Sequence, residues 1–151
     1  MDLKRVVVTG LGALTPIGNT LSEYWEGLVS GKSGADKITY FDCSNFKTQF
    51  ACELKGFNPE DFMDRKLSRK MDRFAQYAIV SSDEAIKDAF PDTSGLDMDR
   101  VGVIWGAGIG GLETFQNEVL GFAAGNGHPR FNPFMIPKMI PDIAPGIISI
   151  R

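Results

Sequence analysis

A glycine-rich segment, Gly106-Ala-Gly-Ile-Gly-Gly111, has the clearest link to chemistry in this sequence of 151 residues. It matches the G-x-G-x-x-G pattern and falls between an expected strand and an expected helix, as dinucleotide-binding loops do. That fingerprint also needs an acidic residue at the end of the next strand, about 20 residues further on. Here that region is Phe131-Asn-Pro133, which offers neither an acid nor a strand pattern. We therefore interpret the loop as a tight strand-to-helix turn, with nucleotide binding as the alternative.

The two cysteines and the single histidine give no indication of a catalytic or metal site. Cys43 and Cys52 lack the third and fourth ligands that a metal site would require, so no metal site is predicted. Neither cysteine lies beside a basic residue that would activate a thiolate, and we expect Cys43 in a loop and Cys52 in the core. His128, the single histidine, lies between Gly127 and Pro129, where a solvated loop residue is expected.

Four basic residues form the second pattern of interest. Lys66, Arg69, Lys70 and Arg73 follow the spacing i, i+3, i+4, i+7, which places them on one face of a helix. The whole chain carries a net charge of -3, so this basic face is a local exception. Such a stripe is typical of a solvated helix face, and docking of an acidic partner is the alternative.

The elements that position these residues alternate between strand and helix. Val6–Val8 and Val101–Trp105 are continuous apolar runs, which predicts strands of a parallel sheet covered on both faces. Thr20-Leu-Ser-Glu23 predicts the capped start of a helix that ends at Gly31. A helix bearing Leu112 and Phe115 is expected after the glycine loop. The order strand, helix, strand, helix indicates an α/β fold with right-handed crossovers.

The segments between these elements are less regular. We expect an irregular insertion over about residues 32–67, with a strand-like stretch near Phe50 and a brief helix opening at Asn58-Pro59. A long helix is expected from about Ser68 to Ala89, with a stripe of small residues that predicts close packing against another element. Beyond Gly127, proline recurs at every fourth position. This excludes one unbroken helix and favours an extended chain followed by a short or kinked helix from Pro137.

Composition narrows the class of protein. Hydrophobic residues make up 43% and charged residues 23%, as in ordinary globular chains. The net charge of -3 predicts no general affinity for nucleic acid, and the short apolar runs predict neither a signal peptide nor a membrane segment. A cytoplasmic location is the expectation. The two expected strands are too few to form a sheet that is covered on both faces, so we expect further chain to complete the core.

Four motifs together resemble those of one known family. The motifs are Arg5-Val-Val-Val-Thr-Gly-Leu-Gly-Ala-Leu-Thr-Pro-Ile-Gly18, Arg69-Lys-Met-Asp-Arg-Phe74, Trp105-Gly-Ala-Gly-Ile-Gly-Gly111 and Asn132-Pro-Phe-Met-Ile-Pro137. The sequence resembles the N-terminal portion of a β-ketoacyl-[acyl-carrier-protein] synthase of the type II elongation class. The resemblance runs along residues 1–151 as one segment and implies an incomplete, N-terminal part of the thiolase-like αβαβα layered fold.

The resemblance also implies roles for particular residues. Gly108 and Ile109 would border the fatty-acyl pocket, with Ile109 as a movable gate. Phe134 would lie at the two-fold dimer interface and reach the acyl pocket of the partner. The docking surface for acyl carrier protein would comprise the following basic residues: Lys66, Arg69, Lys70 and, as a weaker addition, Arg130.

The family's reaction is a decarboxylative condensation of an acyl thioester with malonyl-carrier protein. It uses a cysteine nucleophile, two histidines, a lysine and an oxyanion hole of backbone N-H groups, and no cofactor. The resemblance places all of these beyond Arg151, so this acyltransferase segment contains no catalytic residue and is expected to be inactive alone. The alternatives are a nucleotide-binding α/β module and a non-catalytic chain that pairs with a complete condensing subunit. The implied partners are acyl carrier protein and a second copy of the enzyme.

Overall fold

The computed structural model describes residues 3–151, which divide into two compact units. The first comprises residues 3–57 and Asp83–Thr93, and the second comprises Asn58–Ser82 and Ser94–Arg151. One helix, α3 (Arg73–Ala89), contributes its first half to the second unit and its last turns to the first unit.

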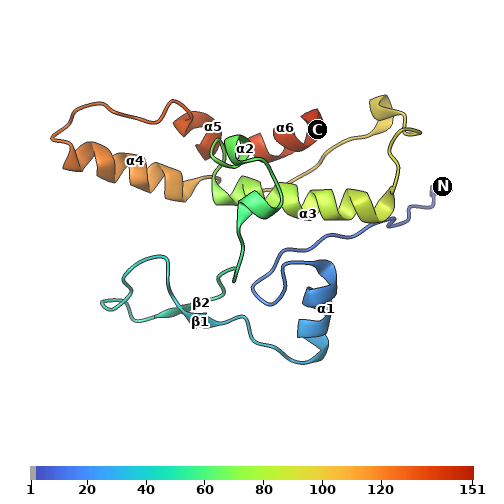
Figure 1. Ribbon diagram of the computed structural model, residues 1–151, viewed down its shortest axis with the longest axis horizontal. Coiled ribbons are helices and arrows are strands. Elements are labelled where there is room, and N and C mark those ends of the chain that lie inside the picture. The colour runs from blue at the N-terminus through green and yellow to red at the C-terminus, as the bar shows by residue number, and fades with distance from the viewer. Residues whose placement is uncertain (1–2) are drawn as a thin grey trace. The chain divides into compact units, whose positions relative to one another are not determined.

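The first unit contains helix α1 (Leu21–Val29) and a short antiparallel pair, β1 (Asp36–Lys37) with β2 (Phe50–Ala51) (Figure 1). The capped start of α1 is confirmed, because the Thr20 hydroxyl accepts the N-H of Glu23 at 3.2 Å. Gly31 follows the helix with φ +67°, the left-handed geometry expected of a C-terminal glycine.

The last turns of α3 hold the segment that precedes α1. The Glu84 carboxylate accepts the N-H of Ala13 and the N-H of Leu21, each at 2.8 Å, and so supplies an acceptor to the first residue of α1. Asp88 accepts the N-H of Leu11 at 3.0 Å. Small residues bring the backbones together here, because a Cβ atom on Gly10 would lie 2.3 Å from the Ala85 carbonyl oxygen. The predicted close packing of the small-residue stripe is confirmed at this end of α3.

The second unit is built around the first half of α3 and contains the other helices. These are the 3-10 helices η1 (Pro59–Asp61) and η2 (Met98–Arg100) and the α-helices α2 (Arg65–Ser68), α4 (Leu112–Ala124), α5 (Met135–Met139) and α6 (Ile143–Ile150). Most fully buried apolar residues of the described chain belong to this unit, including Ala75, Ala78 and Ile79 on α3 and Ala144 on α6. The core therefore lies along the first half of α3.

Several expected boundaries differ from the structure. Helix α3 ends at Ala89 as expected but begins at Arg73 rather than near Ser68. Between the two positions the chain makes a tight turn, in which the N-H groups of Lys70 and Met71 donate to carbonyls three residues back. The first hydrogen bonds of α3 then run from Ala75 and Gln76 to the Asp72 carbonyl. The proline-rich segment is broken at Ile140–Asp142 as predicted, yet α5 begins at Met135 and α6 accommodates Pro145, so the expectation of an extended chain to residue 136 was wrong.

The two expected parallel strands are not formed within residues 3–151. Val6–Val8 and the segment 101–105 have no regular secondary structure, and Val6 and Ile104 are 89% and 100% exposed. A strand exists only where a neighbour supplies the other half of the hydrogen-bond ladder. The described residues supply no such neighbour for either run, and the apolar pattern alone does not create one.

We expect Gly10→Ala to destabilise the protein by roughly 1–3 kcal/mol, because the added methyl group would overlap the Ala85 carbonyl. Gly95→Ala is the matched control, since a Cβ atom there would meet no atom within 4 Å. Thermal unfolding of both variants checks this. Equal melting temperatures would show that α3 can move away from Gly10 without a measurable loss of stability.

Candidate functional site

The basic residues near α2 occupy a helical turn and a bend instead of one continuous helix face. Lys66 lies in α2, Arg69 is its C-cap, and Lys70 is in the turn that follows. Arg73 begins the separate helix α3, so the prediction of a single helical stripe was wrong. The side chains of Lys66, Arg69 and Lys70 are nevertheless all exposed on the second unit.

Two of these cations contact other parts of the second unit. The Lys70 ammonium lies 5.6 Å from the centroid of the Phe134 ring, a cation–π distance. The Arg73 guanidinium pairs with the Glu113 carboxylate at 3.2 Å. Arg130 is exposed in the loop between α4 and α5. Among these basic residues, Lys66, Arg69 and Arg130 are exposed and form no ion pair or cation–π contact within the described residues.

An apolar cavity lies beside the glycine-rich loop. It has a volume of about 310 Å³, and its lining is almost wholly apolar. The lining residues are Ile109, Leu112, Phe115, Met139, Ile140 and Pro141. Ile109 is 68% exposed, so its side chain stands at the open side of this cavity. The geometry could receive an alkyl chain, because it offers hydrocarbon walls and few polar groups.

The other two predicted pocket residues occupy different positions. Gly108 lies in the bend before Ile109 but is absent from the cavity lining, and Phe134 precedes α5 and faces Lys70. A Cβ atom on Gly108 would meet no atom within 4 Å. The structure therefore brings Ile109 to an apolar cavity and leaves Gly108 and Phe134 outside its lining.

The last two glycines of the loop are required by packing. A Cβ atom on Gly110 would lie 2.2 Å from the Met139 carbonyl oxygen, and one on Gly111 would lie 2.3 Å from that of Lys138. Gly110 also has φ +86°, and the N-H of Gly111 donates to Met139 at 2.9 Å. The backbone of the loop thus presses on the end of α5, close to the start of α4 (Figure 1). The alternative of nucleotide binding loses its structural context, because residues 101–107, which lead directly into this loop, form no strand.

Sequence reasoning missed Asp72, which organises this region. Its side chain is 8% exposed, and one carboxylate oxygen accepts both the N-H of Thr114 at 3.0 Å and the hydroxyl of Thr114 at 2.5 Å. Helix α4 has no capping side chain of its own, since its N-cap is Gly111. Asp72 fills that role from outside the helix. The only signal in the sequence was an acidic residue between Lys70 and Arg73, off the expected basic helix face.

The two cysteines exchange the positions expected of them. Cys43 is 3% exposed, and its thiol lies 3.8 Å from the Gln49 carbonyl oxygen, whereas Cys52 is exposed. Alternation with Phe50 suggested an inward Cys52, but the side of this stretch that carries Phe50 and Cys52 is the exposed one, since Phe50 is itself 65% exposed. His128 is exposed in the loop after α4, as expected. Within residues 3–151, no three His, Cys, Asp or Glu side chains are placed to hold a metal ion.

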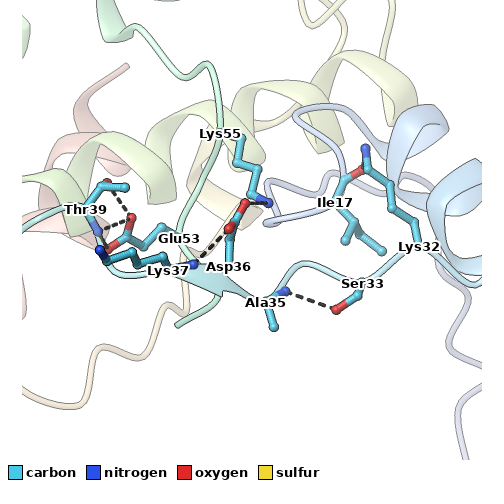
Figure 2. A network of polar contacts seen from close by, with 9 residues as sticks. All are labelled: Ile17, Lys32, Ser33, Ala35, Asp36, Lys37, Thr39, Glu53 and Lys55. Atoms are coloured by element: carbon cyan, nitrogen blue, oxygen red, sulfur yellow. Dashed lines mark hydrogen bonds and ion pairs between the residues drawn. The ribbon is translucent and has the colours of Figure 1, made fainter. Parts of the chain in front are cut away.

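A more polar cavity of about 460 Å³ lies in the first unit, and Lys32 and Lys55 are among its lining residues. Both lysines are engaged: Lys32 donates to the Ile17 carbonyl at 3.1 Å, and Lys55 pairs with Asp36 at 3.0 Å (Figure 2). The hydrogen bond from Lys55 holds the pKa of the Asp36 carboxyl below its usual value. These contacts brace the β1–β2 pair and leave the apolar cavity of the second unit as the better candidate site.

No helix among residues 3–151 combines the length and apolar character needed to cross a membrane.

Comparison with known proteins identifies relatives along the whole described chain. The family model described as "Beta-ketoacyl synthase, N-terminal domain" matches residues 3–151. A 3-oxoacyl-[acyl-carrier-protein] synthase 2 of Staphylococcus aureus is 48% identical over 150 residues, which cover 97% of this chain and 35% of that protein. The protein of the same name from Synechocystis sp. is 45% identical over 151 residues, covering 100% of this chain and 36% of that protein. The chain therefore spans about a third of the length of these relatives.

Solved structures show the same likeness. A type II PKS ketosynthase, determined in complex with its acyl-carrier protein, has a TM-score of 0.77 at 28% identity, covering 98% of this chain and 38% of that one. A beta-ketoacyl synthase from Burkholderia phymatum has a TM-score of 0.77 at 27% identity, covering 98% of this chain and 36% of that one. These likenesses confirm the fold class expected from the sequence, the N-terminal part of the thiolase-like fold.

Proposed function

Since the chain belongs to the β-ketoacyl synthase family as its N-terminal domain, we propose that it forms part of a cytoplasmic 3-oxoacyl-[acyl-carrier-protein] synthase of fatty-acid elongation. Such an enzyme joins an acyl thioester to the carbanion left when malonyl-carrier protein loses carbon dioxide. The family match along the described chain is the observation that carries this proposal. The proposed enzyme needs no cofactor.

In this proposal the apolar cavity beside Ile109 is part of the wall of the acyl pocket. The cavity has apolar walls where an alkyl chain must be received, and Ile109 stands at its open side. Gly108 precedes Ile109 in open space, so the backbone there has room to move and Ile109 can act as a gate. Phe134 is proposed to contribute at an interface with a second copy of the enzyme.

The exposed cations of the second unit are the proposed docking surface for acyl carrier protein. Lys66, Arg69, Lys70 and Arg130 are all exposed. A carrier that presents carboxylates would be steered toward them through long-range attraction. A likeness to a ketosynthase that was determined with its own acyl-carrier protein supports this choice of partner.

We expect this chain by itself to form no ketoacyl product from acyl- and malonyl-carrier protein. The reason is that the family's nucleophilic cysteine, histidines and lysine match no position here. Cys43 is buried, and both Cys43 and Cys52 belong to the first unit, whereas the residues of the apolar cavity belong to the second. Decarboxylation and product formation are measured against a buffer control, and turnover above that control would contradict the assignment.

In a complete enzyme that carries this segment, changing Lys66, Arg69 and Lys70 together to Glu should slow association with acyl carrier protein by about tenfold or more at low salt. The loss should shrink as ionic strength rises, because screening weakens the steering that the cations supply. Activity on a small acyl thioester without the carrier should stay nearly unchanged.

The matched control reverses three exposed lysines of the first unit, Lys4, Lys37 and Lys47, and so changes the net charge by the same amount. Its association rate should change much less. Equal losses in the two triple variants would mean that overall charge, and no defined surface, governs the encounter. Equal losses on the carrier and on the small thioester would assign the basic segment a structural role.

Ile109→Phe in the same enzyme should slow acylation by long chains at least tenfold while sparing short ones, because a larger side chain fills the apolar cavity that only a long chain enters. Acylation rate is measured against chain length. Ile86→Phe, an equal increase in volume at an exposed position of α3, should keep the parent profile. An unchanged profile in folded Ile109→Phe would remove Ile109 from the acyl pocket.

A further inference from the structure

We propose that Asp72 is a positioning residue for Ile109, because it clamps the start of α4, the helix that follows the glycine-rich loop. This inference rests on the proposed function, in which Ile109 borders the acyl pocket. Asp72 is not among the lining residues of the cavity and is assigned no part in the chemistry.

The clamp consists of two hydrogen bonds to one residue. One oxygen of the buried Asp72 carboxylate accepts the N-H and the hydroxyl of Thr114, the third residue of α4. The first N-H groups of a helix have no partner within the helix, and a negative charge there is favoured by the helix dipole. Gly111 at the N-cap offers no side chain for this purpose. Asp72 therefore supplies the capping that the sequence of α4 lacks.

The clamp fits only because Gly111 is small. A Cβ atom at Gly111 would lie 3.0 Å from the same Asp72 oxygen and 2.3 Å from the Lys138 carbonyl oxygen. The loop end is thus held between the Asp72 carboxylate and the backbone of α5, to which the Gly111 N-H also donates. Ile109 lies two residues before this fixed point, and Leu112 and Phe115 lie just after it. The position of the cavity lining relative to α5 follows from where the clamp holds α4.

The neighbours of Asp72 strengthen the same connection. Lys70 lies over the Phe134 ring, and Arg73 pairs with Glu113, the second residue of α4. Three side chains within four consecutive positions thus reach the two segments that flank the cavity. The Asp72 contact is the buried one of the three and consists of charge-assisted hydrogen bonds, so it is the one expected to fix the position of Ile109.

The test uses the complete synthase with Thr114→Val, which removes the hydroxyl donor while keeping the side-chain shape, and Thr114→Ser, which restores the donor. Asp72→Asn tests the carboxylate. Asp97→Asn is the matched control, because Asp97 also caps a helix, accepting the N-H of Asp99 at 3.2 Å, but in η2. Two quantities are measured: the NMR signal of the Ile109 methyl group, and the ratio of long-chain to short-chain acylation rates.

We expect Thr114→Val and Asp72→Asn to shift the Ile109 methyl signal and to change the acylation ratio by about tenfold, which is the effect of losing one charge-assisted hydrogen bond. Thr114→Ser and Asp97→Asn should keep the parent values. An unmoved Ile109 signal in the two folded variants would overturn the inference, as would a shifted signal with an unchanged acylation ratio. If the parent enzyme transfers no acyl group, the proposed function fails, and the Ile109 signal still decides whether Asp72 positions it.

Discussion

The carboxylate of Asp72 is the constraint on which the second unit depends. Asp72 lies between α2 and α3, and its carboxylate caps α4 from a position 42 residues earlier in the chain. A buried carboxylate must be satisfied by strong donors, and the N-H and hydroxyl of Thr114 provide them. Gly111 leaves room both for this oxygen and for the backbone of α5, since a Cβ atom there would lie 3.0 Å from the Asp72 oxygen and 2.3 Å from the Lys138 carbonyl oxygen.

The first unit applies the same physical solution at the other end of α3. There the Glu84 carboxylate accepts N-H groups from the turn around Ala13 and from the first residue of α1. The turn can approach α3 because Gly10 lies against Ala85 without a side chain between them. In both units an acidic side chain from one helix completes the start of another, and a glycine provides the space. Local sequence alone specifies neither pairing, because donor and acceptor are far apart in the chain.

Features that depend on neighbouring residues were predictable from the sequence. Thr20 and Asn58 cap the helices that follow them, and α3 ends at Ala89 as expected from Pro91. Features that depend on distant partners were not predictable. Val6–Val8 has strand composition but lacks a ladder partner among the described residues, and the cap of α4 comes from Asp72, far back in the chain. The expectation for the cysteines failed because alternation shows which residues share a side of a strand but not which side is buried, and Phe50 and Cys52 are both exposed. For the candidate site, the sequence led to Ile109 but concealed Asp72.

The bare apolar runs around Val6 and Ile104 have a consequence for biosynthesis. Proteins are made from the N-terminus, so in the much longer relatives the equivalent segment leaves the ribosome well before most of the chain exists. Helix caps and glycine contacts of the kind seen here can form at that stage, since they need only these residues. The valine-rich runs cannot acquire sheet neighbours until later chain arrives, and exposed runs of this kind pair readily with other strands. Until that later chain arrives, the exposed apolar runs are the part of this segment most open to pairing with other chains.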